Sequence, residues 1–136
     1  MSMGIASDKA IERLEATHLP FHAARAELLS DWRQETPPLS LIMAAYARAI
    51  CSHVDGLSPE QRRQLFSLVE ELLEHGDDEV STAIATCFLE GLQNASDRFD
   101  FRQVAPFLGP LSRSHCVAMD RFHGICTRGL DEGPGE

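Results

Sequence analysis

The segment that decides the fold runs from Asp77 to Asn94 and reads DDEVSTAIATCFLEGLQN. Between Val80 and Ser96 its only charged residue is Glu90, and Ser, Thr and Ala occupy the positions where a surface helix carries charges. Its apolar stripe consists of Val80, Ile84, Cys87, Phe88 and Leu92. A helix that is apolar or small nearly all round is buried on several sides. We therefore predict a central helix here, with the rest of the chain packed around it.

Helical spacing of apolar residues, together with turn-forming residues, predicts six further helices. They cover about residues 7–17, 20–34, 37–53, 59–75, 100–108 and 111–123. No strand pattern is present, so we predict an all-α fold, a single-domain bundle of antiparallel helices in HEAT-like or irregular orthogonal packing. We expect residues 1–6 to be frayed, residues 7–126 to form the domain, and residues 127–136 to form a flexible acidic tail.

Capping residues mark the helix 59–75 and its junction with the central helix. Ser58 and Gln61 match a capping box, in which each side chain bonds the backbone N–H of the other residue. Gly76 is expected to supply the left-handed residue that ends this helix. Asp77 is expected to cap the central helix. The two helices should therefore form an antiparallel hairpin.

Other positions give predictions about caps and the core. Thr36 is expected to cap the helix 37–53, because Pro37 suits a first helical position. Trp32, the only tryptophan, is expected to be a buried core anchor because of its size. The last helix is expected to point four residues inward: Leu111, His115, Met119 and Phe122.

Composition and charge limit the classes of function. The chain has 136 residues and a formal charge of −9, from 21 acidic and 12 basic residues. This balance argues against direct nucleic-acid binding, which needs a positive surface. No apolar run is long enough to span a membrane and no secretory signal is present, so we expect a cytoplasmic protein. The acidic excess suits a basic partner, although many acidic proteins carry such a charge for solubility alone.

The sequence offers little for catalysis. Four potential metal ligands lie close together in the sequence: His115, Cys116, His123 and Cys126. Adjacent residues lie about 100° apart on a helix, so His115 and Cys116 do not converge on one ion, and the spacings match no zinc motif. Asp120, one turn after Cys116, would raise the pKa of that thiol rather than lower it. We therefore predict no metal, no cofactor and no catalytic residue, and expect all four cysteines to be reduced.

An acidic run is the most unusual local feature of the sequence. Its six members fall within ten residues that contain no Lys or Arg: Glu70, Glu71, Glu74, Asp77, Asp78 and Glu79. Acids suit the start of the central helix, whereas acids near the end of helix 59–75 oppose its dipole. We assign Glu70, Glu71 and Glu74 to the solvated side of that helix. The run is open to two interpretations, a surface that binds a basic partner or a solvated corner of capping residues.

Two segments carry a resemblance to a known family. The first reads ELLEHGDDEV over residues 71–80 and continues as AIATCFLEGL over 83–92; the second reads FLGPLSRSHC over 107–116 and continues as MDRF over 119–122. With their lead-in, from about residue 20, they resemble a family of small, uncharacterised bacterial all-helical proteins. Some members of that family look like immunity partners of secreted polymorphic toxins. The resemblance implies a non-catalytic protein that binds and blocks a toxin inside the producing cell.

The leading hypothesis is therefore an immunity or inhibitor protein that binds a basic toxin through the acidic residues named above. The alternative is a helical adaptor or regulatory interaction module without a toxin partner. Sequence patterns do not identify the toxin or the surface that would contact it.

Overall fold

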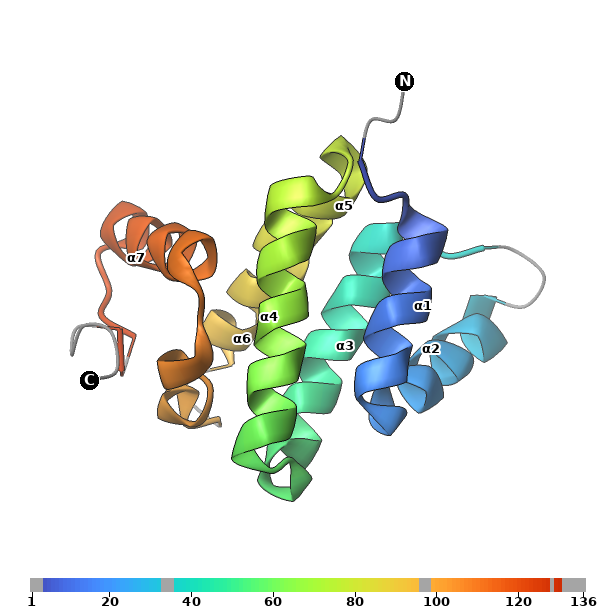
Figure 1. Cartoon of the computed structure of the whole chain (residues 1–136), viewed down its shortest axis with the longest axis horizontal. Helices are drawn as coiled ribbons and strands as arrows, with labels where there is room; N and C mark the ends of the chain where they lie inside the picture. Colours follow the sequence, from blue (N-terminus) through green and yellow to red (C-terminus); the bar gives the residue numbers. More distant parts are fainter. Residues whose placement is uncertain (1–3, 33–35, 96–98, 128, 131–136) are drawn as a thin grey trace.

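The computed structural model describes residues 4–32, 36–95, 99–127 and 129–130. Within these residues the chain forms seven α-helices and no named strand, which confirms the predicted all-α fold (Figure 1). The α-helices are α1 (Ser7–Thr17), α2 (Leu19–Trp32), α3 (Leu39–His53), α4 (Pro59–His75), α5 (Asp78–Ala83), α6 (Glu90–Asn94) and α7 (Pro110–His123). A π-helical segment, η2 (Ile84–Leu89), joins α5 to α6, and short 3-10 turns are η1 (Val54–Gly56), η3 (Phe101–Gln103) and η4 (Ala105–Phe107).

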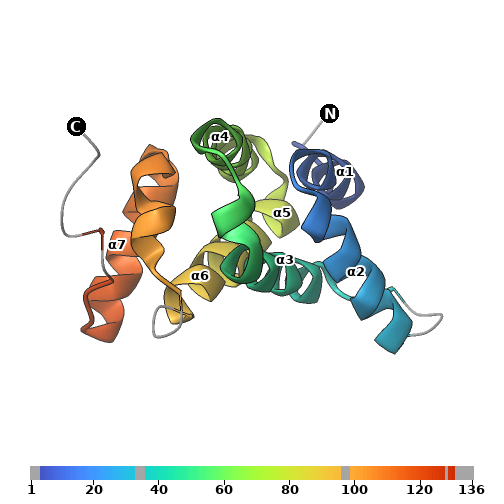
Figure 2. The same ribbon diagram turned by 90° about the horizontal axis from the view of Figure 1, so that it is seen from below.

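The helices pack in two uneven layers. Figure 2 shows α1 and α4 on one side and α2, α3 and α6 on the other, while α5 leads from the first layer to the second. At one end α2 packs on α1 and α3, and at the other end α7 packs on α4 and α6. No helix of the described chain is both long and apolar enough to cross a membrane.

The predicted central helix is confirmed as one continuous element made of α5, η2 and α6, in contact with α1, α3, α4 and α7. Four of its fully buried residues recur at intervals of four: Val80, Ile84, Phe88 and Leu92. In an α-helix that spacing drifts by about 40° at each step. In the π segment the turn is wider, and the backbone N–H of Glu90 bonds Ala85 O five residues back. The wider turn keeps the stripe facing the core.

The junction of α4 and α5 is the predicted hairpin. The capping box of Ser58 and Gln61 is present, with both bonds formed, and Asp77 Oδ1 accepts the backbone N–H of Val80 at 2.9 Å. The prediction for Gly76 is wrong: its φ is −68° and its ψ 155°, an extended conformation. Glycine is required there by close approach, because an added Cβ would collide with Leu72 O and the Val80 side chain.

Ile5 lies in the segment predicted to be frayed, but it pairs with the junction of α4 and α5. Ile5 forms an isolated parallel bridge with Gly76, in which Ile5 N donates to His75 O at 2.8 Å and Asp77 N donates to Ile5 O at 2.9 Å. The expectation of a frayed end therefore fails for residues 4–6, and residues 1–3 lie outside the described chain.

Two predictions around α2 and α3 need correction. α3 begins at Leu39 with Pro38 as its N-cap, so Thr36 is not the cap. The cause is Pro37, which precedes a second proline and is thereby disfavoured from helical geometry. Trp32 is only half-buried, at the last residue of α2, where Figure 2 shows this helix running outward past α3.

The face that α7 turns inward also differs from the prediction. The buried residues are Ser112, Cys116 and Asp120, whereas Leu111 is 45% exposed and Phe122 79% exposed. His115 and Met119 are half-buried. The helix is rotated about its axis relative to the prediction, because polar groups elsewhere in the chain form hydrogen bonds with its buried polar residues. Thr127 and Leu130, which the predicted flexible tail includes, are buried, and residues 131–136 of that tail lie outside the described chain.

Candidate functional site

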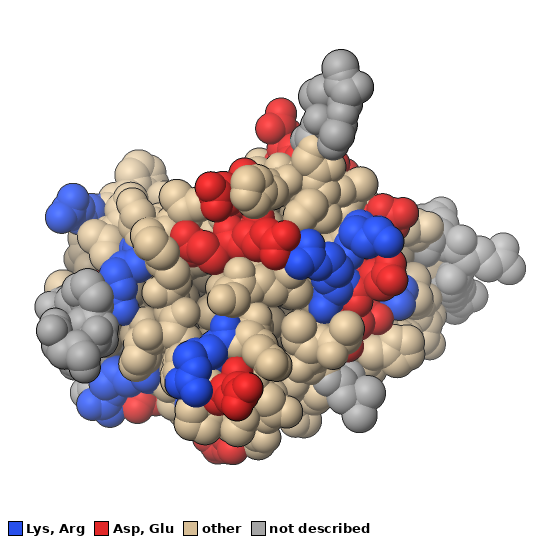
Figure 3. All heavy atoms as spheres, viewed as in Figure 1, with Lys and Arg blue, Asp and Glu red and all other residues tan. Residues whose placement is uncertain are grey.

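The six residues of the acidic run, which we call the acidic corner, gather at the junction of α4 and α5. Figure 3 shows a band of acidic side chains across the upper part of α4, beside basic side chains over α1. The structure therefore brings Glu70, Glu71, Glu74, Asp77, Asp78 and Glu79 to one region, from the last turns of α4 to the first turn of α5.

Half of the acidic corner holds the fold together. Glu70 accepts hydrogen bonds from α7, from Leu111 N at 2.6 Å and from Ser112 N at 3.1 Å. Glu71 accepts two from Arg13 of α1, at 2.8 and 3.1 Å. These bonds lower the pKa of Glu71 and raise the pKa of Arg13. Asp77 caps α5. Three carboxylates are thus satisfied within the molecule.

The other half of the acidic corner faces solvent. Glu74, Asp78 and Glu79 are exposed. Glu74 Oε1 lies 3.6 Å from His75 Nε2. Asp78 and Glu79 have no ion pair with any residue that the structure describes. Exposed carboxylates without a cationic neighbour attract a basic partner at long range.

A groove adjoins these free carboxylates. It has a volume of about 420 Å³ and lies between the start of α3 and the outer side of α5 and η2. Its lining is Pro38, Leu39, Ser40, Asp78, Glu79, Thr82, Ala83, Thr86 and Cys87. We call it the α3–α5 groove. Apolar and small side chains form most of the lining, and its only charges are the two carboxylates at one end.

The π-helical turn borders the groove. Thr86 Oγ1 donates to Thr82 O at 2.8 Å and lies 3.5 Å from Cys87 Sγ. Interruptions of this kind within α-helices are frequent at functional sites. Here the turn allows Phe88 to point into the core while Thr86 and Cys87 remain on the groove side.

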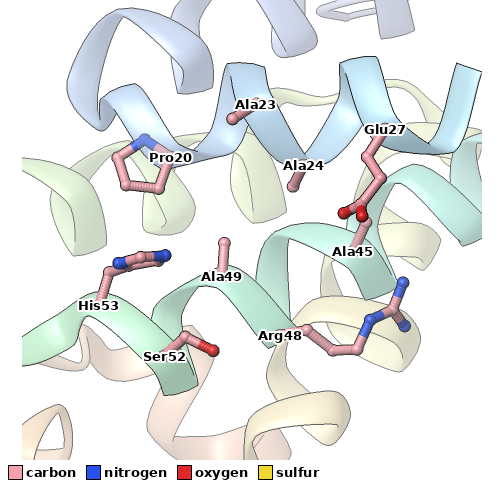
Figure 4. A pocket seen from close by; sticks show the side chains of 9 residues that line it. All are labelled: Pro20, Ala23, Ala24, Glu27, Ala45, Arg48, Ala49, Ser52 and His53. Atoms are coloured by element: carbon pink, nitrogen blue, oxygen red, sulfur yellow. The ribbon is translucent and has the colours of Figure 1, made fainter. Parts of the chain in front are cut away.

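A second groove lies between α2 and α3 on a different part of the surface. It has a volume of about 250 Å³, and Figure 4 shows that four alanines form its centre. Glu27 and Arg48 lie toward one end, and Pro20 and His53 toward the other. Because it offers one acidic and one basic side chain, this groove has no net charge preference between partners.

Of the described cysteines and histidines, Cys87 lines the α3–α5 groove and His53 lines the groove between α2 and α3. Cys116 is fully buried, and burial, reinforced by the charges of Asp120 and Glu90, raises the pKa of its thiol to about 12. His115, the residue before Cys116, contacts Glu90, with its Nε2 2.9 Å from Glu90 Oε2. A thiol with so high a pKa is a poor nucleophile at neutral pH. Among the described residues no group of His, Cys, Asp and Glu is arranged to hold a metal ion.

A buried polar network explains the rotation of α7. Asp120 Oδ2 accepts Thr127 N at 2.7 Å, and its Oδ1 accepts Thr127 Oγ1 at 2.6 Å and Gln93 Nε2 at 3.0 Å. Gln93 Nε2 also donates to Cys116 O at 3.0 Å. These bonds join α6, α7 and the segment after α7. Burial of a carboxylate is tolerable only when such partners are present.

The family model described as a domain of unknown function, DUF7674, matches residues 13–124. The chain belongs to this family. Neither a curated protein nor a solved structure matches the chain. The matched residues of the DUF7674 domain include α4, the whole central helix and α7, and so contain the acidic corner and the α3–α5 groove.

Sequence reasoning located the acidic residues of the DUF7674 domain but missed the groove beside them. Pro38 and Leu39 lie about forty residues before Asp78, and only the packing of α3 on α5 brings them together. It also missed the exposed apolar residues of α7, because amphipathic patterning assigned Leu111 and Phe122 to the core. Ile125, just after the helix, is 48% exposed as well.

Proposed function

We propose that the DUF7674 domain is a non-catalytic protein that binds and neutralises a basic protein toxin inside the cell that produces it, as immunity proteins do. One observation carries the proposal: Asp78 and Glu79 are exposed, lack an ion pair among the described residues, and edge an apolar groove. Such a surface combines the two contributions that a tight protein complex needs. Apolar burial supplies affinity, and complementary charge raises the association rate and excludes wrong partners.

The six acidic residues have different roles in this proposal. Glu74, Asp78 and Glu79 contact or steer the basic partner. Glu70, Glu71 and Asp77 act indirectly, because their bonds to α7, α1 and α5 fix the corner on which the free carboxylates stand. A rigid surface loses little conformational entropy on binding, which favours affinity.

The experiment is a co-expression assay with the product of the reading frame that neighbours the gene in its native host. Wild type should restore growth to cells that produce this toxin and should form a complex with it in size-exclusion chromatography. The double variant Asp78→Asn/Glu79→Gln should protect less well and bind more slowly. The control Asp55→Asn/Glu60→Gln makes the same charge change at exposed positions outside the groove. If no neighbouring product is toxic or bound, the proposal fails.

The alternative, a helical adaptor without a toxin, is favoured by the apolar side of α7. Leu111 and Phe122 are exposed at the two ends of α7, at one end of the helix array, and Ile125 is exposed just after this helix. Exposed apolar surface marks contact sites. If the protein is an adaptor, the Phe122→Ser variant should no longer bind its partner, and the Asp78→Asn/Glu79→Gln variant should still bind it. If the protein is a toxin inhibitor, Phe122→Ser should keep binding and Asp78→Asn/Glu79→Gln should weaken it.

A further inference from the structure

We propose that the α3–α5 groove receives a helix of the partner that carries an apolar side chain and an arginine or lysine one turn apart. This inference rests on the proposed binding function and names the element that the surface recognises. Its starting point is the division of the groove into an apolar part, built from Leu39, Ala83 and Cys87, and an acidic end, built from Asp78 and Glu79.

The spacing of these two parts is set by α5 itself. Glu79 and Ala83 are four residues apart, so they stand one above the other on the same side of the helix, about 6 Å apart. A partner helix lying along α5 with an apolar residue and a basic residue four apart repeats that distance. Its apolar side chain then lies in the groove against Ala83 and the half-buried Cys87, while its cation meets Glu79.

The lining also permits a helix to come close. Ser40, Thr82, Ala83 and Thr86 are small, and small residues allow two helix backbones to approach each other. The wall contributed by α5 and η2 runs from Asp78 to Cys87, about 14 Å at the helical rise, which accommodates between two and three turns. The groove is therefore suited to a short amphipathic helix, a common mode of recognition by apolar grooves.

Charge complementarity selects this occupant over a second copy of the chain or an acidic helix. The lining contains two carboxylates and no lysine or arginine, and Glu74 stands nearby at the end of α4. A partner helix without a basic residue would bring Glu79 into an apolar contact without a counter-ion, which is unfavourable.

The test uses a phage library of helix-forming peptides with one randomised face, selected on the wild-type chain. Selected sequences should pair an apolar residue with Arg or Lys three or four positions away. The blocking variant is Thr82→Arg, which places a cation four residues from Asp78 and fills the groove from an exposed position. This substitution should lower the affinity for a selected synthetic peptide by about tenfold or more. The control Ala26→Arg, at an exposed site on α2, should leave binding unchanged.

A second readout locates the bound peptide. Cys87 lines the groove and Cys126 does not, so saturating peptide should slow alkylation of Cys87 and leave that of Cys126 unchanged. Selection of sequences without basic residues, no enrichment at all, or equal binding to Thr82→Arg would overturn the inference. A toxin that is neutralised equally by wild type and Thr82→Arg would overturn it while the proposed function stands. Peptide binding that Thr82→Arg abolishes, without any toxin bound, would refute the proposed function alone.

Discussion

Glu70, near the end of α4, holds Ser112 in the first turn of α7 by two hydrogen bonds to one carboxylate oxygen, from the backbone N–H at 3.1 Å and from Oγ at 3.0 Å. The N-cap residue of α7 is Gly109, which has no side chain to cap the helix. A Cβ at this position would collide with the Glu70 carboxylate. An acid from another helix thus performs the capping.

Removal of this cap should destabilise the fold. Glu70→Ala is expected to lower the free energy of unfolding by about 1–2 kcal/mol, because N-caps contribute that much and a charged acceptor is stronger than a neutral one. Urea denaturation measures the change. Glu74→Ala, an exposed acid on the same helix, is the control and should change it little. Equal stability of the two variants would show that the α7 contact contributes nothing.

The Glu70 contact illustrates where sequence reasoning stops. Caps formed within a few residues, such as Ser58 with Gln61, follow from local pattern and were predicted. The pairing of Glu70 with a helix some forty residues later has no local signal, so the assignment of Glu70 to the solvated side was wrong.

The rotation of α7 relative to the prediction also results from contacts between residues distant in sequence. Asp120 is buried because Gln93 and Thr127, both distant in sequence, supply its hydrogen bonds. Hydrophobic patterning assumes that a carboxylate faces water. It therefore assigned the wrong face of α7 to the core. The central helix was predicted correctly because nearly every position in it is apolar or small, so its burial did not depend on knowing its neighbours.

Truncation of Phe88 should destabilise the fold more than removal of the Glu70 cap. The Phe88 ring is fully buried in the π-helical segment, with centroids 6.3 Å from both Phe21 and Phe66. Phe88→Ala is expected to cost about 3–5 kcal/mol through lost burial and the cavity that remains. Thermal melting of this variant beside Thr86→Ala, exposed on the same segment, tests it. A midpoint close to wild type would contradict the central role of this helix.

The stability should fall in acid because of Glu15. This carboxylate, with its side chain 12% exposed, accepts hydrogen bonds from Arg25, from Tyr46 Oη at 2.6 Å and from His22 Nδ1 at 3.0 Å. Burial, the largest single influence, would raise the pKa of Glu15, but these bonds together outweigh it and lower the pKa to about 2.

A folded-state pKa below the unfolded value means that Glu15 stabilises the fold above about pH 4.5, and that this contribution is lost as the pH falls toward 2. The expected loss is on the order of 3 kcal/mol. Glu15→Gln should remove this part of the pH dependence, measured by denaturation at pH 2.5 to 7, whereas Glu12→Gln, at an exposed position of α1, should keep it. Parallel curves for Glu15→Gln and wild type would refute the assignment.

The thiols should react in order of their exposure. Cys126 is exposed, Cys87 is half-buried, and Cys116 is fully buried with its pKa raised to about 12. We expect rapid alkylation of Cys126, slower alkylation of Cys87 and none of Cys116 until the chain unfolds. Cys87 belongs to the apolar stripe predicted for the central helix, but it is half-buried in the groove lining, so we expect it to react before the chain unfolds. Mass spectrometry of the native protein over time separates the sites, and early labelling of Cys116 would contradict the packing of α7.

The free half of the acidic corner should control the rate of association with a basic partner. Glu74→Gln/Asp78→Asn/Glu79→Gln removes three exposed charges, at positions that carry none of the contacts to α1 and α7 formed by Glu70 and Glu71. Steering by charge acts over about 10 Å at 0.1 M salt and weakens as salt rises. The triple variant should therefore associate more slowly than wild type at low salt, and its rate should depend less on salt. Stopped-flow measurements with the toxin at several ionic strengths give the salt dependence of the association rate for wild type and for the triple variant.

Glu70 and Glu71 are left intact in this variant. Their neutralisation would mix the effect on association with loss of the α7 cap and of the α1 ion pair. If wild type and triple variant share one rate and one salt slope, the corner does not steer the partner, and the apolar side of α7 around Phe122 becomes the surface to test.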